Sequence, residues 1–143
     1  MVRRAMNNLV LDTHVWIWLV EGNPRLPLEV RSRIEETAIE SWVYISAISP
    51  WELGLLVAKK KLNLGSDVQE WVDRALGLQG LRLAPLSPKV AVDSTRLPFE
   101  IHSDPADRIL VATARRLGAT LVTADRLLLQ HGERGYFSYL AAS

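Results

Sequence analysis

Short hydrophobic runs alternate with amphipathic segments along this chain of 143 residues. The hydrophobic runs are mostly rich in β-branched, aromatic or leucine side chains, which favours buried strands. They occupy residues 9–11, 42–45, 81–84, 120–123 and 136–140. The segments between them have helical spacing, and we expect helices at residues 13–19, 27–39, 50–60, 66–77, 88–97 and 105–117, with a short one after residue 125. Strands that alternate with helices predict a mostly parallel sheet covered by helices on both faces, which is the α/β class.

Two of the expected helices begin with the same kind of signal. In Ser49-Pro50-Trp51-Glu52, serine is a preferred N-cap, proline suits the first helical position, and the glutamate completes a capping box. In Asp104-Pro105-Ala106-Asp107, the first aspartate can cap, the proline can follow it, and the second aspartate falls in the first turn. A third helix, at residues 27–39, is predicted from the spacing of Leu28, Ile34 and Ile39.

Four acidic residues lie at equivalent places in this pattern. Asp12 and Asp125 each come just after a hydrophobic strand, whereas Glu52 and Asp107 lie in the first turn of a helix. In an open parallel sheet, the carboxyl ends of the strands and the amino ends of the following helices gather at one edge, where ligands bind. The four acids are far apart in sequence, yet this topology brings them together.

Such a cluster of carboxylates requires a compensating charge. Two like charges about 4 Å apart repel by roughly 4 kcal/mol at an effective dielectric constant near 20. A bound cation, or protonation of some of the acids, would remove this repulsion. Oxygen ligands alone suit a hard ion such as Mg²⁺ or Mn²⁺ rather than zinc. An ion of this kind can activate water for phosphodiester hydrolysis, which is the chemistry that the pattern favours.

Each acid also has a purely structural explanation. Glu52 could be only the capping-box glutamate, and Asp107 could complement the helix dipole or pair with Arg108. Asp125 could cap the short helix that follows it, and Asp12 could be an N-cap as well. These alternatives stay open for every residue taken alone. The coincidence of four acids at equivalent places favours the cation site.

Overall composition changes this picture little. Seventeen basic and sixteen acidic residues give a net charge of +1, which neither requires nor excludes a nucleic-acid partner. Cysteine is absent, so there is no disulfide and no thiolate metal site, as suits a reducing compartment. The longest hydrophobic runs fall well short of the roughly 18 residues that a membrane span needs. We therefore expect a cytoplasmic protein with no membrane partner and no signal peptide.

The four acids lie in four stretches with specific sequences: residues 11–18 (LDTHVWIW), 45–53 (ISAISPWEL), 104–112 (DPADRILVA) and 121–125 (LVTAD). In this order they resemble the PIN domain, and within it the VapC-type ribonuclease toxins of prokaryotic VapBC toxin–antitoxin modules. The resemblance covers nearly the whole chain. It implies a single PIN domain over residues 1–143, with a PIN-like three-layer sandwich in which helices cover both faces of a parallel sheet of four to five strands.

The resemblance also implies Mg²⁺- or Mn²⁺-dependent endoribonuclease activity. The family's catalytic and metal-binding acids fall here on Asp12, Glu52, Asp107 and Asp125. Small hydroxyl residues and one further acid match positions beside them, where they could orient the ligands: Thr13, Ser49, Thr123 and Asp104.

The resemblance implies partners as well. VapC-like proteins are usually homodimers, and a VapB-type antitoxin inserts into the groove that holds the active site. Arg108 could contact RNA phosphate or the antitoxin, or form a structural ion pair with one of the acids. His14 and His102 lie near the acids in sequence, but we favour a structural role for each. For most of the tryptophans near the acids, Trp16, Trp18 and Trp51, we favour core or dimer packing over stacking on an RNA base.

Two other functions remain open. A catalytically silent module could keep the PIN-like fold, dimerise and pair with an antitoxin, although the presence of all four acids argues against it. A phosphohydrolase of the haloacid dehalogenase type also begins with a strand that ends in aspartate. That chemistry requires a second aspartate two residues later, where this sequence has His14.

Overall fold

The computed structural model describes residues 7–101 and 104–143. Within this part of the chain, five strands and seven helices follow one another in the order β1 (Leu9–Leu11), α1 (Thr13–Glu21), α2 (Leu28–Glu40), β2 (Val43–Ser46), α3 (Ile48–Ala58), α4 (Val68–Leu76), β3 (Leu81–Ala84), α5 (Pro88–Thr95), α6 (Pro105–Leu117), β4 (Thr120–Thr123), α7 (Arg126–Glu133) and β5 (Tyr139–Ala141). None of the helices in these described ranges is long and apolar enough to cross a membrane.

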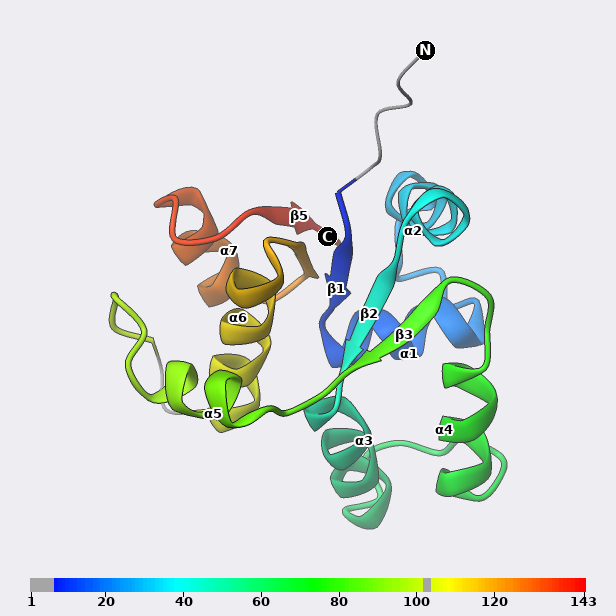
Figure 1. Cartoon of the computed structure of the whole chain (residues 1–143). Coiled ribbons are helices and arrows are strands. Elements are labelled where there is room, and N and C mark those ends of the chain that lie inside the picture. Colours follow the sequence, from blue (N-terminus) through cyan, green and yellow to red (C-terminus); the bar gives the residue numbers. More distant parts are fainter. Residues whose placement is uncertain (1–6, 102–103) are drawn as a thin grey trace.

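The strands form one sheet in the order β3-β2-β1-β4-β5, and each neighbouring pair is parallel. In the centre, Leu11 is paired with Ile45 on one side and with Val122 on the other. The chain therefore starts in the middle strand and adds strands first on one side and then on the other (Figure 1). This arrangement confirms the predicted parallel sheet. It also places the carboxyl ends of β1, β2 and β4 at one edge, the lower end in Figure 1.

Alternate residues of the central strand point into two separate hydrophobic clusters. Leu9 and Leu11 pack with α1, α2 and α4, in a cluster that also contains Trp16 and Trp71. Val10 faces the opposite side, where it packs with Leu110 and other side chains of α6 and with Leu128 of α7. Because successive side chains of a strand point to opposite faces, a fully buried strand needs apolar residues on both. Two helical layers thus enclose the sheet, as the predicted three-layer sandwich requires.

Helix α2 buries only Ile34 of the three apolar residues from which it was predicted. Val30, Ile34 and Thr37, spaced by four and three residues, form its buried side. Leu28 and Ile39 are 79% and 77% exposed, so they do not contribute to this buried side. The small buried Thr37 satisfies its hydroxyl within the helix by donating to the Arg33 carbonyl oxygen (2.8 Å), which allows a polar residue to take the place expected for an apolar one.

The last strand begins later than predicted. β5 starts at Tyr139 rather than near Tyr136. Tyr136 stacks on Phe99, with ring centroids 4.3 Å apart, and Phe137 belongs to the second hydrophobic cluster. The aromatic residues that indicated a strand therefore pack as an aromatic group against the loop before α6.

Candidate active site

One pocket at the carboxyl edge of the sheet contains every acid that the sequence singled out. Its volume is about 310 Å³. The lining side chains come from α1, α3, α6 and the segments after β1 and β4: Asp12, His14, Trp18, Glu52, Asp104, Asp107, Ala124 and Asp125. Residues up to 113 positions apart thus meet in one place, as the parallel topology predicted. We refer to it as the acid pocket.

Asp12 is fixed at the end of the central strand. Its backbone N–H donates to the Val122 carbonyl oxygen (2.9 Å), which extends the pairing of β1 with β4 by one residue. Its Oδ2 accepts a hydrogen bond from the Thr123 hydroxyl (2.7 Å), and the residue is only 9% exposed. The Thr123 hydroxyl oxygen in turn accepts from the backbone N–H of Asp125 (3.0 Å). One threonine therefore orients two acids of the acid pocket.

Glu52 is held by the other predicted hydroxyl residues. The Thr13 hydroxyl donates to Glu52 Oε1 (2.5 Å), and it lies 2.7 Å from the Ser49 hydroxyl. Helix α3 begins at Ile48 after an Ala47 N-cap, so the prediction that Ser49 caps this helix is wrong. The capping box with Glu52 is wrong for the same reason. The side chains of Ser49 and Glu52 instead contact Thr13 of α1, and this contact positions Glu52 in the acid pocket.

The remaining acids combine a structural role with a place in the acid pocket. Asp125 Oδ1 caps α7 by accepting from the Leu128 N–H (3.0 Å). Asp104 caps α6 by accepting from the Ala106 N–H (3.0 Å), as predicted, and Pro105 is the first helical residue. Asp107 lies in the first turn of α6 and is half-buried. The structural explanations of these acids are therefore correct without excluding a role in the pocket.

Burial and mutual repulsion change the acidity of two carboxyl groups. The pKa of Glu52 is raised to about 7, mainly by burial and also by the negative charges of Asp12, Asp104 and Asp107, against the opposing hydrogen bond from Thr13. Burial also raises the pKa of Asp12, more than the hydrogen bond from Thr123 and the neighbouring His14 lower it. Both groups would ionise more readily beside a cation, so the electrostatics of the acid pocket favour a positively charged ligand.

The donor set fits a hard divalent cation by its chemistry, since all five acids offer carboxylate oxygens. The acids are not already gathered as a compact coordination shell, however. Among the residues that the structure describes, no group of three His, Cys, Asp or Glu side chains lies close enough together to hold a metal ion. An ion would therefore draw the carboxylates inward, or bind some of them through water.

Arg108 lies beside the acid pocket rather than in its wall. It is half-buried, and its Nη2 donates to the Ile101 carbonyl oxygen (3.3 Å). It lines a neighbouring hollow together with Leu97 and Phe99. This hydrogen bond to the loop before α6 helps to hold the Arg108 side chain in place. Its contact with RNA stays a prediction.

The sequence interpretation missed two residues of the acid pocket. His14 is exposed and Trp18 half-buried, and both line the acid pocket with ring centroids 6.3 Å apart. They are spaced by four residues in the helix that follows Asp12, and this spacing placed them on one helix face. The exposure of His14 does not fit the structural role favoured for it. Trp18 also packs against the first hydrophobic cluster, as expected, and Trp16 is a core residue packed edge-on against Trp71. His102 lies outside the described residues.

Comparison with known proteins agrees with this fold. The sequence model of the PIN domain matches residues 9–133. The chain is 32% identical over 126 residues to ribonuclease VapC22 of Mycobacterium tuberculosis, which covers 88% of this chain and 93% of that protein.

Solved structures have the same fold. One is VapBC2 from Rickettsia felis bound to a promoter DNA fragment, with a TM-score of 0.68 and 18% identity over 95% of this chain and 99% of that chain. Another is DNA-bound VapBC from Salmonella typhimurium, with a TM-score of 0.66 and 19% identity over 96% of this chain and 100% of that chain. Since the family match spans most of the sequence, the chain belongs to the PIN domain family, and within it to the VapC-type proteins.

Proposed function

We propose that this protein is a Mg²⁺- or Mn²⁺-dependent endoribonuclease, the toxin of a type II toxin–antitoxin module that acts in the cytoplasm. The observation that carries the proposal is the convergence of Asp12, Glu52, Asp107 and Asp125 in one pocket. The raised pKa of Glu52 and of Asp12 adds support, because it reflects a pocket that a cation would stabilise. The similarity to a ribonuclease supports RNA as the substrate.

The four acids would hold the cation, and their neighbours would keep them in place. Thr123 fixes Asp12 Oδ2 and the Asp125 backbone, while Thr13 fixes Glu52 Oε1. Ser49 supports the Thr13 hydroxyl, and Asp104 adds a carboxylate at the rim of the pocket. A bound divalent ion would lower the pKa of a water and neutralise charge that develops on the RNA phosphate. Residues fixed in this way lose little freedom on binding, which favours catalysis.

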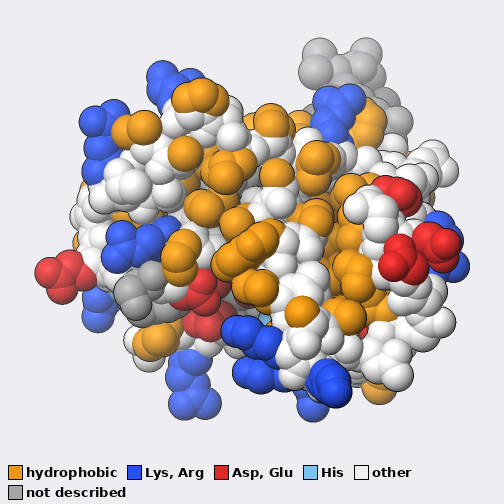
Figure 2. All heavy atoms as spheres, turned by 90° about the horizontal axis from the view of Figure 1, so that it is seen from below, with side chains coloured by type: hydrophobic (Ala, Val, Ile, Leu, Met, Phe, Trp, Pro, Cys, Tyr) orange, Lys and Arg blue, Asp and Glu red, His pale blue; other side chains and the backbone are white. Residues whose placement is uncertain are grey.

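Two protein partners belong to the proposal. A VapB-type antitoxin is supported by the solved VapBC structures that share this fold. A homodimer is supported by large apolar side chains left exposed on α3, around β3 and on α5: Trp51, Leu83, Leu86 and Val92. Figure 2 shows a broad hydrophobic area on the end of the molecule where the strands terminate, with acidic side chains grouped beside it.

The decisive experiment measures RNA cleavage by the purified chain with Mg²⁺, with Mn²⁺ and with EDTA. We expect cleavage only with a divalent ion, and we expect Asp12→Asn to abolish it without unfolding the protein. Glu36→Gln, which removes an exposed acid of α2, is the matched control and should leave the rate unchanged. Full activity of Asp12→Asn would overturn the mechanism. Antitoxin binding without cleavage of any RNA would instead favour the silent binding module.

A further inference from the structure

A second hollow lies between α5 and α6, separate from the acid pocket. Its volume is about 340 Å³, which is within the range of ligand-binding pockets. Three arginines and one aspartate surround an apolar floor, so positive charge is in excess: Asp93, Arg96, Leu97, Pro98, Ala112, Arg115 and Arg116. We call this site the arginine hollow. Its charge and chemistry suit an anionic ligand such as a phosphate group.

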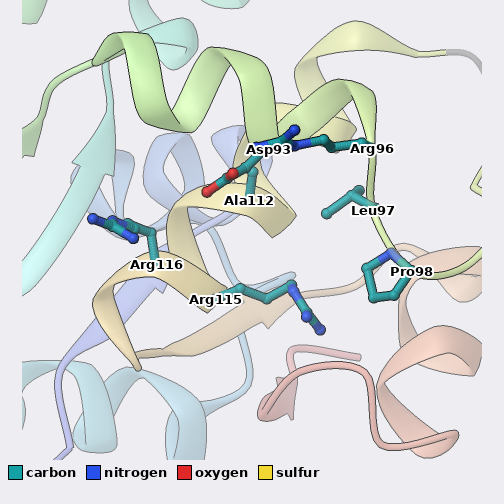
Figure 3. Close-up of a pocket in the computed structure, with 7 residues that line it drawn as sticks. All are labelled: Asp93, Arg96, Leu97, Pro98, Ala112, Arg115 and Arg116. Atoms are coloured by element: carbon teal, nitrogen blue, oxygen red, sulfur yellow. The ribbon is translucent and has the colours of Figure 1, made fainter.

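The arginines reach the arginine hollow from two helices. Figure 3 shows Arg115 and Arg116 extending in opposite directions from α6, while Arg96 comes from the end of α5. Arg115 Nη1 donates to the Tyr136 carbonyl oxygen, which fixes the direction of its guanidinium group. A guanidinium carries five N–H donors in a planar fork, so this bond uses only a part of the donors of Arg115.

The arginine hollow continues toward the acid pocket along α6. Arg108, Ala112 and Arg115 are spaced by four and three residues and therefore lie on one face of this helix. A further hollow of about 330 Å³ shares Leu97 with the arginine hollow and is also lined by Arg108, which directly follows Asp107 of the acid pocket in α6. At about 1.5 Å per residue, eight residues of helix separate Asp107 from Arg115 by about 12 Å. A row of cationic groups thus starts beside the acids and follows α6.

We propose that Arg96 and Arg116, together with Arg115, bind backbone phosphates of single-stranded RNA away from the bond that is cleaved. This inference rests on the proposed ribonuclease function and extends it to a second contact region on the substrate. Arg108 beside Asp107, and the Leu97 that the two hollows share, favour an RNA strand that runs from the acid pocket along α6 over a free anion. Arginines near helix ends also complement the helix dipoles, so the test must separate binding from folding.

The test measures RNA affinity as a function of salt. A fluorescent single-stranded RNA of about twelve nucleotides, long enough to span both sites, is titrated with the Asp12→Asn protein in Mg²⁺ so that it stays intact. Arg96→Gln and Arg116→Gln, alone and combined, are compared with Arg33→Gln, which removes an exposed arginine of α2. We expect each variant of the hollow to weaken binding several-fold and to lower the slope of log Kd against log salt by about 0.7, while the control changes neither.

Two further measurements keep the result unambiguous. The melting temperature of each variant reports any structural loss, and we expect it to stay near that of the parent protein. With Asp12 restored, the same substitutions should raise KM for long RNA with little effect on kcat.

The inference and the proposed function can fail separately. An unchanged salt slope in the double variant, while the protein with Asp12 restored still cleaves RNA, would overturn the inference alone. Stabilisation by inorganic phosphate, or weaker antitoxin binding, with RNA affinity unchanged, would likewise overturn it in favour of a free-anion site or a protein contact. Failure of the unsubstituted protein to cleave any RNA would overturn the proposed function itself.

Discussion

At the scale of single residues, two threonines hold acids of the acid pocket in place. Thr123 donates to Asp12 Oδ2 and accepts from the Asp125 N–H, and Thr13 donates to Glu52 Oε1. Both threonines are fully buried, so removing either hydroxyl leaves a carboxylate oxygen, buried in Asp12 and half-buried in Glu52, without its donor. Such a substitution should therefore lower the free energy of unfolding and also disturb the orientation of the acids.

Thr123→Val tests this dual role. The substitution keeps the shape of the side chain but removes the donor to buried Asp12, so we expect a loss of about 1–3 kcal/mol in the free energy of unfolding. Cleavage should fall by about 10- to 100-fold, because a partner that orients a metal-binding carboxylate is lost. Urea denaturation and initial cleavage rates measure the two effects. Thr95→Val, at an exposed hydroxyl of α5, is the control; equal effects of both substitutions would contradict the assigned role.

The raised pKa of Glu52 predicts a pH-dependent stability in the absence of divalent ions. The carboxyl has an ordinary pKa of 4.5 and a folded-state pKa of about 7. Well below the ordinary value the group is protonated in both states and contributes nothing. Between the two values the folded state binds more protons, so stability falls as pH rises, and the full penalty is present above the folded-state pKa.

Glu52→Gln should therefore stabilise the metal-free protein at high pH only. Glu52 is partly exposed, so we expect a gain of no more than about 1–2 kcal/mol near pH 8 and none near pH 4. Thermal melts in EDTA across this range measure the difference between the two proteins. A gain of the same size at every pH would mean that the ionised carboxylate of Glu52 is not its source.

At the scale of elements, one tight turn requires glycine. Gly80 precedes β3 with φ +81°, and a Cβ added there would lie 2.1 Å from the Ala38 carbonyl oxygen. The Gly80 carbonyl oxygen accepts from the Val43 N–H (2.9 Å), which ties this turn to β2. The close approach of two backbones, in addition to the left-handed conformation, makes the position intolerant of any side chain.

Gly80→Ala should destabilise the protein more than Gly22→Ala. Gly22 also has a positive φ, of 65°, but no atom lies within 4 Å of an added Cβ. We expect a loss of about 1 kcal/mol for Gly22→Ala from backbone strain, and clearly more for Gly80→Ala because the backbone must also shift. Urea denaturation of the two variants measures the contrast. Equal losses would show that the turn adjusts freely.

At the scale of the whole molecule, the acid pocket connects segments from both halves of the chain. Its acids come from the segments after β1 and β4 and from α3 and α6. A cation bound there would contact only the folded state, since the unfolded chain does not bring these groups together. Its binding energy therefore adds to the free energy of unfolding.

Mg²⁺ and Mn²⁺ should raise the melting temperature of the protein. At an ion concentration of about 100 times Kd, mass action adds about 2.7 kcal/mol to the free energy of unfolding. Asp12→Asn should remove most of this gain, because it removes a charged ligand from the centre of the acid pocket. Differential scanning fluorimetry with and without each ion measures the shift. A melting temperature indifferent to both ions would count against a cation site.

The sequence by itself determined the order of the elements and the edge at which the acids gather. The strands at residues 9–11, 81–84 and 120–123 were predicted with the bounds that the structure shows. In β1 and β4, where every residue is buried, a largely apolar run is readable without a structure. The acids Asp12 and Asp125 follow such runs, so parallel topology was enough to bring them together.

Tertiary structure alone decided how the acid pocket is built. Ser49 and Glu52 serve contacts with Thr13, 36 and 39 residues away, and Thr123 binds Asp12 across 111 residues. Local rules of helix capping therefore misread Ser49. The arginine hollow, in the same way, depends on how α5 packs against α6. Local propensity describes interactions within a few residues, whereas these contacts are set by the packing of elements that are distant in sequence.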